Sequence, residues 1–169
     1  TGENSFVITL TGTNDKPLAT FDTAQIATED TEAITGLLTS TDADTTDTVS
    51  YSLLGAEIPG LTINTNGSWT FNPSDAAYQD LAEGAQKVIT VNYSATDSSL
   101  ATDNGSFDIT LTGTNDIPLV DTTTTSNLPG GAEDTDYTIT KQQLLAGFSD
   151  ADRDANGNQQ TLNITGLTA

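Results

Sequence analysis

The sequence predicts an all-β protein that folds as an antiparallel two-sheet sandwich and is arranged as a tandem array. The chain is rich in Thr, and together with Val, Ile, Phe and Tyr this composition favours strands over helices. Short segments with apolar side chains on alternate residues are separated by turn residues, which is the pattern of half-buried strands. One phrase of fourteen residues also occurs twice, which indicates repeated units.

The repeated phrase is SFVITLTGTNDKPL at residues 5–18 and SFDITLTGTNDIPL at residues 106–119. Twelve of the fourteen positions are identical, and the two copies are 101 residues apart. Each copy begins as a strand and ends in Gly-Thr-Asn-Asp-x-Pro, in which Gly and Pro end the strand. A spacing near one hundred residues is the size of one small β-domain, so the phrase predicts a joint between successive domains.

This spacing divides the chain of 169 residues into three parts. Residues 1–14 are expected to form the last strand of a preceding repeat, and residues 15–116 one complete repeat. Residues 117–169 are expected to form the first half of a following repeat, because they echo its opening motifs. The tail contains AEDT at residues 132–135, which corresponds to TEDT at residues 28–31. The Asp-Ala-Asp motif at residues 42–44 also recurs in the tail, at residues 150–152.

About seven short strands are expected within the complete repeat. They lie at residues 19–27, 33–38, 49–53, 61–63, 69–71, 88–95 and 107–111. Asn66-Gly67 predicts a tight hairpin turn, and residues 75–84 suggest a short helix that ends at a glycine. This succession of strands and turns is typical of an immunoglobulin-like or cadherin-like sandwich. The expected core contains Trp69, Phe71, Tyr93, Phe107 and Ile109.

The chain is strongly acidic, with 24 Asp and Glu residues, four Lys and Arg residues and a net charge of −20. Such a charge argues against binding to nucleic acid or to an anionic membrane surface. It favours bound divalent cations, although solubility or adaptation to salt would also explain it. The chain contains neither Cys nor His. Disulfides, thiolate chemistry and the usual zinc ligands are therefore absent, and no enzyme activity is expected.

Residues 61–73 (LTINTNGSWTFNP), residues 76–81 (AAYQDL) and the Gly-Thr-Asn-Asp-x-Pro ending together resemble the VCBS repeat. This family occurs in very large bacterial surface proteins, including RTX adhesins. The tail resembles the start of a related cadherin-like repeat. The resemblance implies an extracellular location at the bacterial cell surface. Family members commonly carry an Asp-Gly-Asn-Gly-Gly turn before the last strand, whereas residues 97–105 here read DSSLATDNG.

Calcium is the expected cofactor, because Ca²⁺ prefers several carboxylate, carbonyl and water oxygens. The joints resemble the cadherin arrangement, in which an Asn-Asp linker shares ions with acidic residues of adjacent domains. Eleven acidic residues are candidate ligands. At the first joint they are Asp15, Glu29, Asp30, Asp42 and Asp44, and at the second Asp116, Glu133, Asp134, Asp150, Asp152 and Asp154. The alternative is that these motifs only build turns.

The function expected from these observations is that of a calcium-stabilised structural extender. It would project a distal binding domain of the adhesin for cell adhesion or biofilm formation. The alternative is a direct recognition module, which would bind a glycan or a protein through residues 55–60 and 97–105. The expected partners are neighbouring repeats of the same chain, with edge-strand pairing between molecules as a further possibility.

Overall fold

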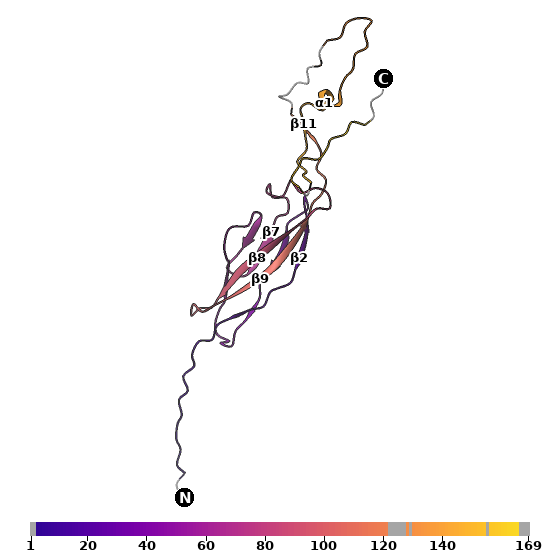
Figure 1. Ribbon diagram of the computed structural model, residues 1–169. Helices are drawn as coiled ribbons and strands as arrows, with labels where there is room; N and C mark the ends of the chain where they lie inside the picture. Colours follow the sequence, from indigo (N-terminus) through magenta and orange to yellow (C-terminus); the bar gives the residue numbers. More distant parts are fainter. Residues whose placement is uncertain (1–2, 122–127, 129, 155, 166–169) are drawn as a thin grey trace. The chain divides into compact units, whose positions relative to one another are not determined.

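A computed structural model describes residues 3–121, 128, 130–154 and 156–165 (Figure 1). It confirms the all-β prediction, because the described part of the chain contains eleven strands and one helix of four residues. The elements are β1 (Leu18–Ala19), β2 (Gln25–Thr28), β3 (Ile34–Leu37), β4 (Ser40–Thr41), β5 (Ser50–Leu53), β6 (Leu61–Ile63), β7 (Ser68–Phe71), β8 (Gln86–Thr96), β9 (Thr102–Thr112), β10 (Leu119–Val120), α1 (Lys141–Leu144) and β11 (Phe148–Ser149).

Two sheets form the sandwich. One has the strand order β2-β9-β8-β5 and the other β3-β7-β6, while β1 pairs with β4 and β10 with β11. The pairs β5–β8 and β6–β7 are antiparallel, as predicted. The pair β2–β9 is parallel, with Gln25 opposite Ile109 and Thr28 opposite Thr112. This parallel pair brings the residue after β2 to the same end of the sheet as the residue after β9.

The chain divides into two compact units. The first unit comprises the N-terminal segment up to Ala24, Thr35–Phe71 and Thr90–Asp108. Its core is aromatic: the rings of Trp69 and Phe107 lie 5.2 Å apart, and those of Phe21 and Phe107 lie 5.0 Å apart. Since β7 carries Trp69 and β9 carries Phe107, these rings pack the two sheets against each other. All five residues predicted for the core are buried.

The hairpin predicted at Asn66-Gly67 is confirmed. Ile63 of β6 lies opposite Trp69 of β7. Gly67 has a φ of +86°, and its N–H donates to the Asn64 carbonyl at 2.9 Å. Glycine adopts this left-handed conformation without strain, which explains its place in the turn.

The second unit comprises Gln25–Ile34, Asn72–Ile89 and the chain from Ile109 onward. The helix predicted at residues 75–84 is wrong, because this segment folds as successive turns. The Tyr78 N–H donates to the Asp75 carbonyl, and the Leu81 N–H to the Tyr78 carbonyl. The buried Tyr78 ring anchors the turns and lies 5.2 Å from the Lys87 ammonium. Burial of this ring, together with the backbone bonds of Gly84 and Ala85 to Gly113, favours turns over the local helical preference of the segment.

Two other regions differ from the sequence-based expectation. Residues 3–14 form no strand, and the side chains of Phe6, Val7 and Leu10 are exposed. Residues 97–105 are not one loop, because β8 ends at Thr96 and β9 already begins at Thr102. In the described part of the chain, no helix is long and apolar enough to span a membrane.

The Tyr93 hydroxyl yields a test of the first unit's core. It accepts from the Phe21 N–H at 3.1 Å and donates to the Phe21 carbonyl at 2.9 Å. Tyr93→Phe leaves both groups of this backbone unpaired, so it should lower the free energy of unfolding by about 1–3 kcal/mol. Urea unfolding measures the loss. Tyr51→Phe is the control and should cost less, because the Tyr51 hydroxyl contacts one Ser40 hydroxyl. Equal losses in both variants would contradict this account.

Candidate metal centre

In the second unit, acidic residues from three segments lie close together. We call Glu29, Asp30, Asp116, Asp150 and Asp152 the Glu29 cluster. Glu29 follows β2, Asp116 follows β9 in the repeated phrase, and Asp152 belongs to the Asp-Ala-Asp motif of the tail. The Asp116 N–H donates to the Asp152 carboxylate at 3.0 Å, and the Asp152 N–H donates to Asp150 at 3.0 Å. The repeated phrase and the tail motif are thus directly hydrogen-bonded.

Glu29 is held in the cluster by its own backbone and by one carboxylate oxygen. Its N–H donates to the Thr112 carbonyl at 2.9 Å, which extends the β2–β9 ladder by one bond. Its Oε2 accepts from the Thr114 N–H at 3.0 Å. Asp30, the next residue, has a φ of +60°, and its carboxylate accepts from Gln79 and from the Thr114 hydroxyl.

Three carboxylate oxygens of the cluster are buried without a hydrogen-bond partner. They are Glu29 Oε1, Asp116 Oδ2 and Asp152 Oδ1. The side chains of Glu29 and Asp152 are completely buried, with an exposed fraction of 0%. A buried carboxylate without a partner is unfavourable. These oxygens therefore fit a bound cation, which would supply the missing partner.

Burial and mutual repulsion also perturb the acidity of the cluster. Burial raises the pKa of the Glu29 carboxyl. The hydrogen bond from the Thr114 N–H acts in the opposite direction and lowers this pKa, but its effect is smaller. The negative charges of Asp30, Asp116 and Asp152 raise the pKa of Glu29 further. Burial also raises the pKa of Asp116, and the neighbouring charges of Asp30, Asp152 and Asp150 act in the same direction. The folded protein therefore disfavours full ionisation of this site when no cation is bound.

The first unit contains a second acidic cluster with the same local hydrogen bonds. We call Asp15, Asp42, Asp44 and Asp47 the Asp44 cluster. The Asp15 N–H donates to Asp44 at 2.7 Å, and the Asp44 N–H donates to Asp42 at 2.9 Å. These two bonds correspond to the bonds of Asp116 with Asp152 and of Asp152 with Asp150. The Oδ2 atoms of Asp42 and Asp47 are buried and have no hydrogen-bond partner.

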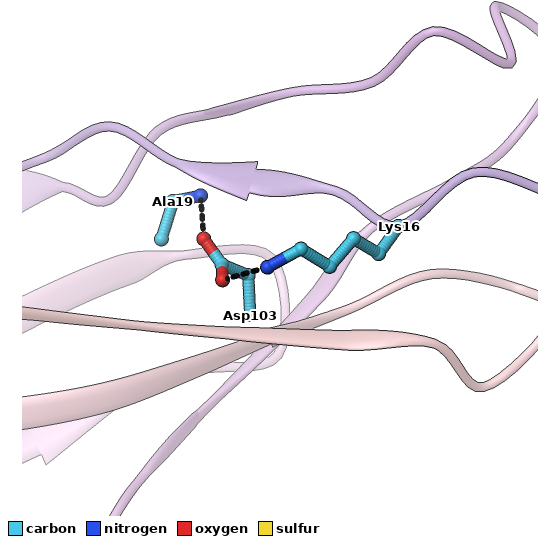
Figure 2. A network of polar contacts seen from close by, with 3 residues as sticks. All are labelled: Lys16, Ala19 and Asp103. Atoms are coloured by element: carbon cyan, nitrogen blue, oxygen red, sulfur yellow. Dashed lines mark hydrogen bonds and ion pairs between the residues drawn. The ribbon is translucent and has the colours of Figure 1, made fainter.

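The side chains of Asn14 and Lys16 contact two further carboxylates of the first unit. The Asn14 amide donates to Asp97 at 3.0 Å, which lowers the pKa of the Asp97 carboxyl. Figure 2 shows that Asp103 accepts from the Lys16 ammonium at 2.6 Å and from the Ala19 N–H at 3.0 Å. The Lys16 ammonium holds the pKa of Asp103 below its usual range. Both carboxylates thus already have partners.

The predicted grouping of the candidate ligands differs from the observed one in two ways. The sequence places Glu29 and Asp30 with Asp15, but in the structure they lie with Asp116. The parallel pairing of β2 with β9 is the reason, because it brings Glu29 to Thr112. The sequence also places Glu133 and Asp134 with Asp116, but both side chains are exposed in the structure. Among the described residues, neither is a charge that shifts the pKa of Glu29 or Asp116.

Asp154 has a structural role in its own loop. Its carboxylate accepts from the Asn156 N–H at 2.8 Å, from the Asn158 N–H at 2.9 Å and from the Asn158 amide. These bonds lower the pKa of the Asp154 carboxyl, those from Asn158 most strongly. The side chain thus closes a turn in its own loop.

Sequence reasoning missed two residues that build the Glu29 cluster. Thr114 and Gln79 orient Glu29 and Asp30. Asp47, which is not among the eleven candidate ligands, also carries an unpaired buried oxygen. Thr114 belongs to the repeated Gly-Thr-Asn-Asp phrase, so its recurrence in both copies could have identified it as part of the site. Across the described ranges, no group of three or more acidic side chains is already arranged to hold a metal ion. Coordination would require the carboxylates of the Glu29 cluster to converge.

These features define an immunoglobulin-like β-sandwich module with an acidic, partly buried carboxylate cluster. A family model described as the bacterial Ig domain matches residues 14–110. The chain belongs to this family. A comparison with curated protein sequences finds no match.

Solved structures are similar to this chain at low sequence identity. The protocadherin gamma B7 extracellular cadherin domains 1–4 have 18% identity and a TM-score of 0.50, covering 85% of this chain and 34% of that one. Human protocadherin-24 EC1-2 has 17% identity and a TM-score of 0.44, covering 86% and 64%. A chimeric titin Z1Z2 has 14% identity and a TM-score of 0.39, covering 60% and 99%. The chain thus spans about a third of the protocadherin gamma B7 chain.

The raised pKa values predict how pH affects the cation-free protein. Because both pKa values are raised, the folded protein without a cation binds protons at Glu29 and Asp116 more tightly than the unfolded chain does. In a chelator, protonation of these two carboxyls should therefore increase the free energy of unfolding as pH falls from 7 to 5. The gain is lost again as pH rises through the raised folded-state pKa values. Thermal unfolding at pH 7 and pH 5 measures this gain in stability. Glu29→Gln should reduce the gain.

Asp154→Asn is the control for this experiment. The lowered pKa of Asp154 places its own contribution to the pH dependence below about pH 4, outside the tested range. Asp154→Asn should therefore keep the wild-type gain between pH 7 and 5. A gain that is as large in Glu29→Gln as in the wild type would contradict the prediction.

Proposed function

We propose that the chain is a calcium-stabilised extender module of a large bacterial surface adhesin of the RTX type, with residues 15–116 as one VCBS repeat. The observation that carries this proposal is that three neighbouring acidic residues, Glu29, Asp116 and Asp152, each have a buried carboxylate oxygen without a hydrogen-bond partner. They belong to the repeat itself, to the joint and to the following segment. An ion that joins them would fix successive repeats to each other.

Calcium suits these ligands better than the other common metals. Zinc prefers Cys and His, which the chain lacks. Magnesium demands nearly ideal octahedral geometry and gives up its water reluctantly, whereas calcium accepts six to eight oxygens in flexible arrangements. An open pocket lined by Asp30, Gln79, Asn115 and Asp116 would admit water as an additional ligand. The Asp44 cluster would hold an ion at the earlier joint in the same way.

The net charge of −20 supports an ion-dependent rod. Repulsion among these carboxylates opposes compaction, and bound divalent cations reduce it. The partners of the module are neighbouring repeats of its own chain, and its place is outside the cell. High external calcium would stiffen the array after export, a sequence of events implied by the resemblance to RTX adhesins.

Direct ligand recognition is the second candidate function. An open pocket in the first unit is lined in part by Glu57, Ile58 and Pro59, within the region proposed above for recognition. Specific binding of the isolated chain on a glycan array would favour this candidate, especially if binding were lost in Glu57→Ala. The extender function predicts no specific binding in this assay.

The proposed ion makes Asp116 a test of the site. At a calcium concentration of one hundred times Kd, an ion that binds only the folded state adds about 2.7 kcal/mol to the free energy of unfolding. Asp116→Asn keeps the backbone N–H that bonds to Asp152 but removes the charge, so most of this gain should be lost. Thermal unfolding with and without calcium measures it. Asp108→Asn is the control, because Asp108 is exposed and bonds to the Thr90 hydroxyl.

A retained calcium gain in Asp116→Asn would remove Asp116 from the ligand set. Loss of the gain in Asp108→Asn as well would indicate a general charge effect instead of a site.

Small-angle scattering tests the mechanical part of the proposal. A protein with several tandem copies of this repeat should become longer and stiffer in millimolar calcium and more compact on average in EDTA, because the joint ions restrict bending. Magnesium at the same ionic strength is the control for screening. A maximum dimension that does not respond to EDTA would contradict the calcium-dependent extender.

A further inference from the structure

One segment of the second unit contacts both the repeated phrase and the acidic loop of the tail. This segment, residues 80–85, is called the platform below. It belongs to the turns that follow Tyr78 and contributes none of the unpaired carboxylate oxygens described above. Its contacts are made through the backbone, so they do not depend on the chemistry of its side chains.

The first contact is with the repeated phrase. The Gly84 N–H donates to the Gly113 carbonyl at 3.0 Å, and the Gly113 N–H donates to the Ala85 carbonyl at 2.8 Å. The approach is so close that a Cβ atom on Gly113 would lie 2.4 Å from the Ala82 carbonyl oxygen and 2.5 Å from that of Leu81. Only glycine fits at this position, because the obstructing atoms belong to the backbone.

The second contact is with the acidic loop of the tail. The Arg153 N–H donates to the Asp80 carbonyl at 3.0 Å, and Leu81 and Arg153 form a parallel β-bridge. The Arg153 guanidinium bonds within its own loop, to the Gly157 carbonyl at 3.1 Å. Arg153 directly follows Asp152, so this bridge fixes the backbone beside a completely buried carboxylate.

We propose that the platform is a docking surface for the Asp-Ala-Asp loop of the following repeat, and that it positions Asp152 against Asp116. The inference rests on the proposed function for the role of the ion, but the docking itself requires no ion. Gly113 is then a positioning residue. Because Gly113 has no side chain, the repeated phrase can contact the platform that also contacts the loop. Asp116 and Asp152 are then already held in place, so cation binding costs less conformational entropy.

The first test is amide hydrogen exchange of the whole chain in a chelator. If the loop is docked, the exposed residue Arg153 should have an amide that exchanges at least about tenfold more slowly than an unprotected amide. In Gly113→Ala this protection should be lost, while the amides of Val91 and Tyr93 in the first unit stay protected. Rapid exchange of Arg153 in the wild type would overturn the docking proposal, whatever the behaviour of the variant.

The matched control is Gly12→Ala, at the same position of the other copy of the phrase. A Cβ on Gly12 meets no heavy atom within 4 Å. This variant should therefore keep the protection of Arg153. Arg153→Ala is a second control that also keeps the backbone N–H, and it should preserve docking. Loss of protection in either control would overturn the account based on backbone contacts.

Calcium titration by calorimetry then separates docking from the function of the site. Gly113→Ala should weaken calcium binding at least about tenfold, equivalent to about 1.4 kcal/mol, whereas Gly12→Ala should not. An unchanged calcium affinity together with a deprotected Arg153 would overturn the positioning role. If the wild-type protein did not bind calcium, the proposed function would fail. Slow exchange of the Arg153 amide in the wild type would still support the docking surface.

Discussion

The arrangement of the acidic site depends on the parallel pairing of β2 with β9. Because both strands run in the same direction, their ends meet, and the Glu29 N–H continues the ladder by bonding to Thr112. This single bond brings the completely buried Glu29 carboxylate beside the repeated phrase at residues 106–119. An antiparallel pair would have placed the residue after β2 beside the start of β9. The sheet topology, and not the local acidic motif, therefore decides which residues can share an ion.

The sequence predicted the sandwich well because its strands carry their own signals. Aromatic and β-branched residues alternate along β7, β8 and β9, and the turn at Gly67 is encoded locally. The helix predicted at residues 75–84 failed for the opposite reason. Its turn signals were compatible with a helix, but the burial of Tyr78 and the two bonds of Gly113 to Gly84 and Ala85 are long-range effects. Local sequence patterns do not reveal such long-range contacts.

The candidate site was predictable in its residues but not in its grouping. Repetition at fixed spacing identified Asp15 and Asp116 as equivalent, and the structure gives both the same bond to an Asp-Ala-Asp motif. Repetition does not say at which end of a repeat the Glu29 loop emerges, because it carries no information on strand direction. The parallel pair supplied that direction. Whether these residues bind calcium stays a prediction.

The two copies of the phrase also differ in a way that has a physical consequence. Lys16 pairs with Asp103 in the first copy, whereas Ile117 stands at the corresponding position of the second and is exposed. The ion pair involves an exposed ammonium and is screened by salt, so it contributes little to rigidity. The bonds that both copies share run from a backbone N–H to an aspartate and are insensitive to side-chain exchange at this position. The difference between Lys16 and Ile117 is therefore compatible with the same backbone bond to the Asp-Ala-Asp motif in both copies of the phrase.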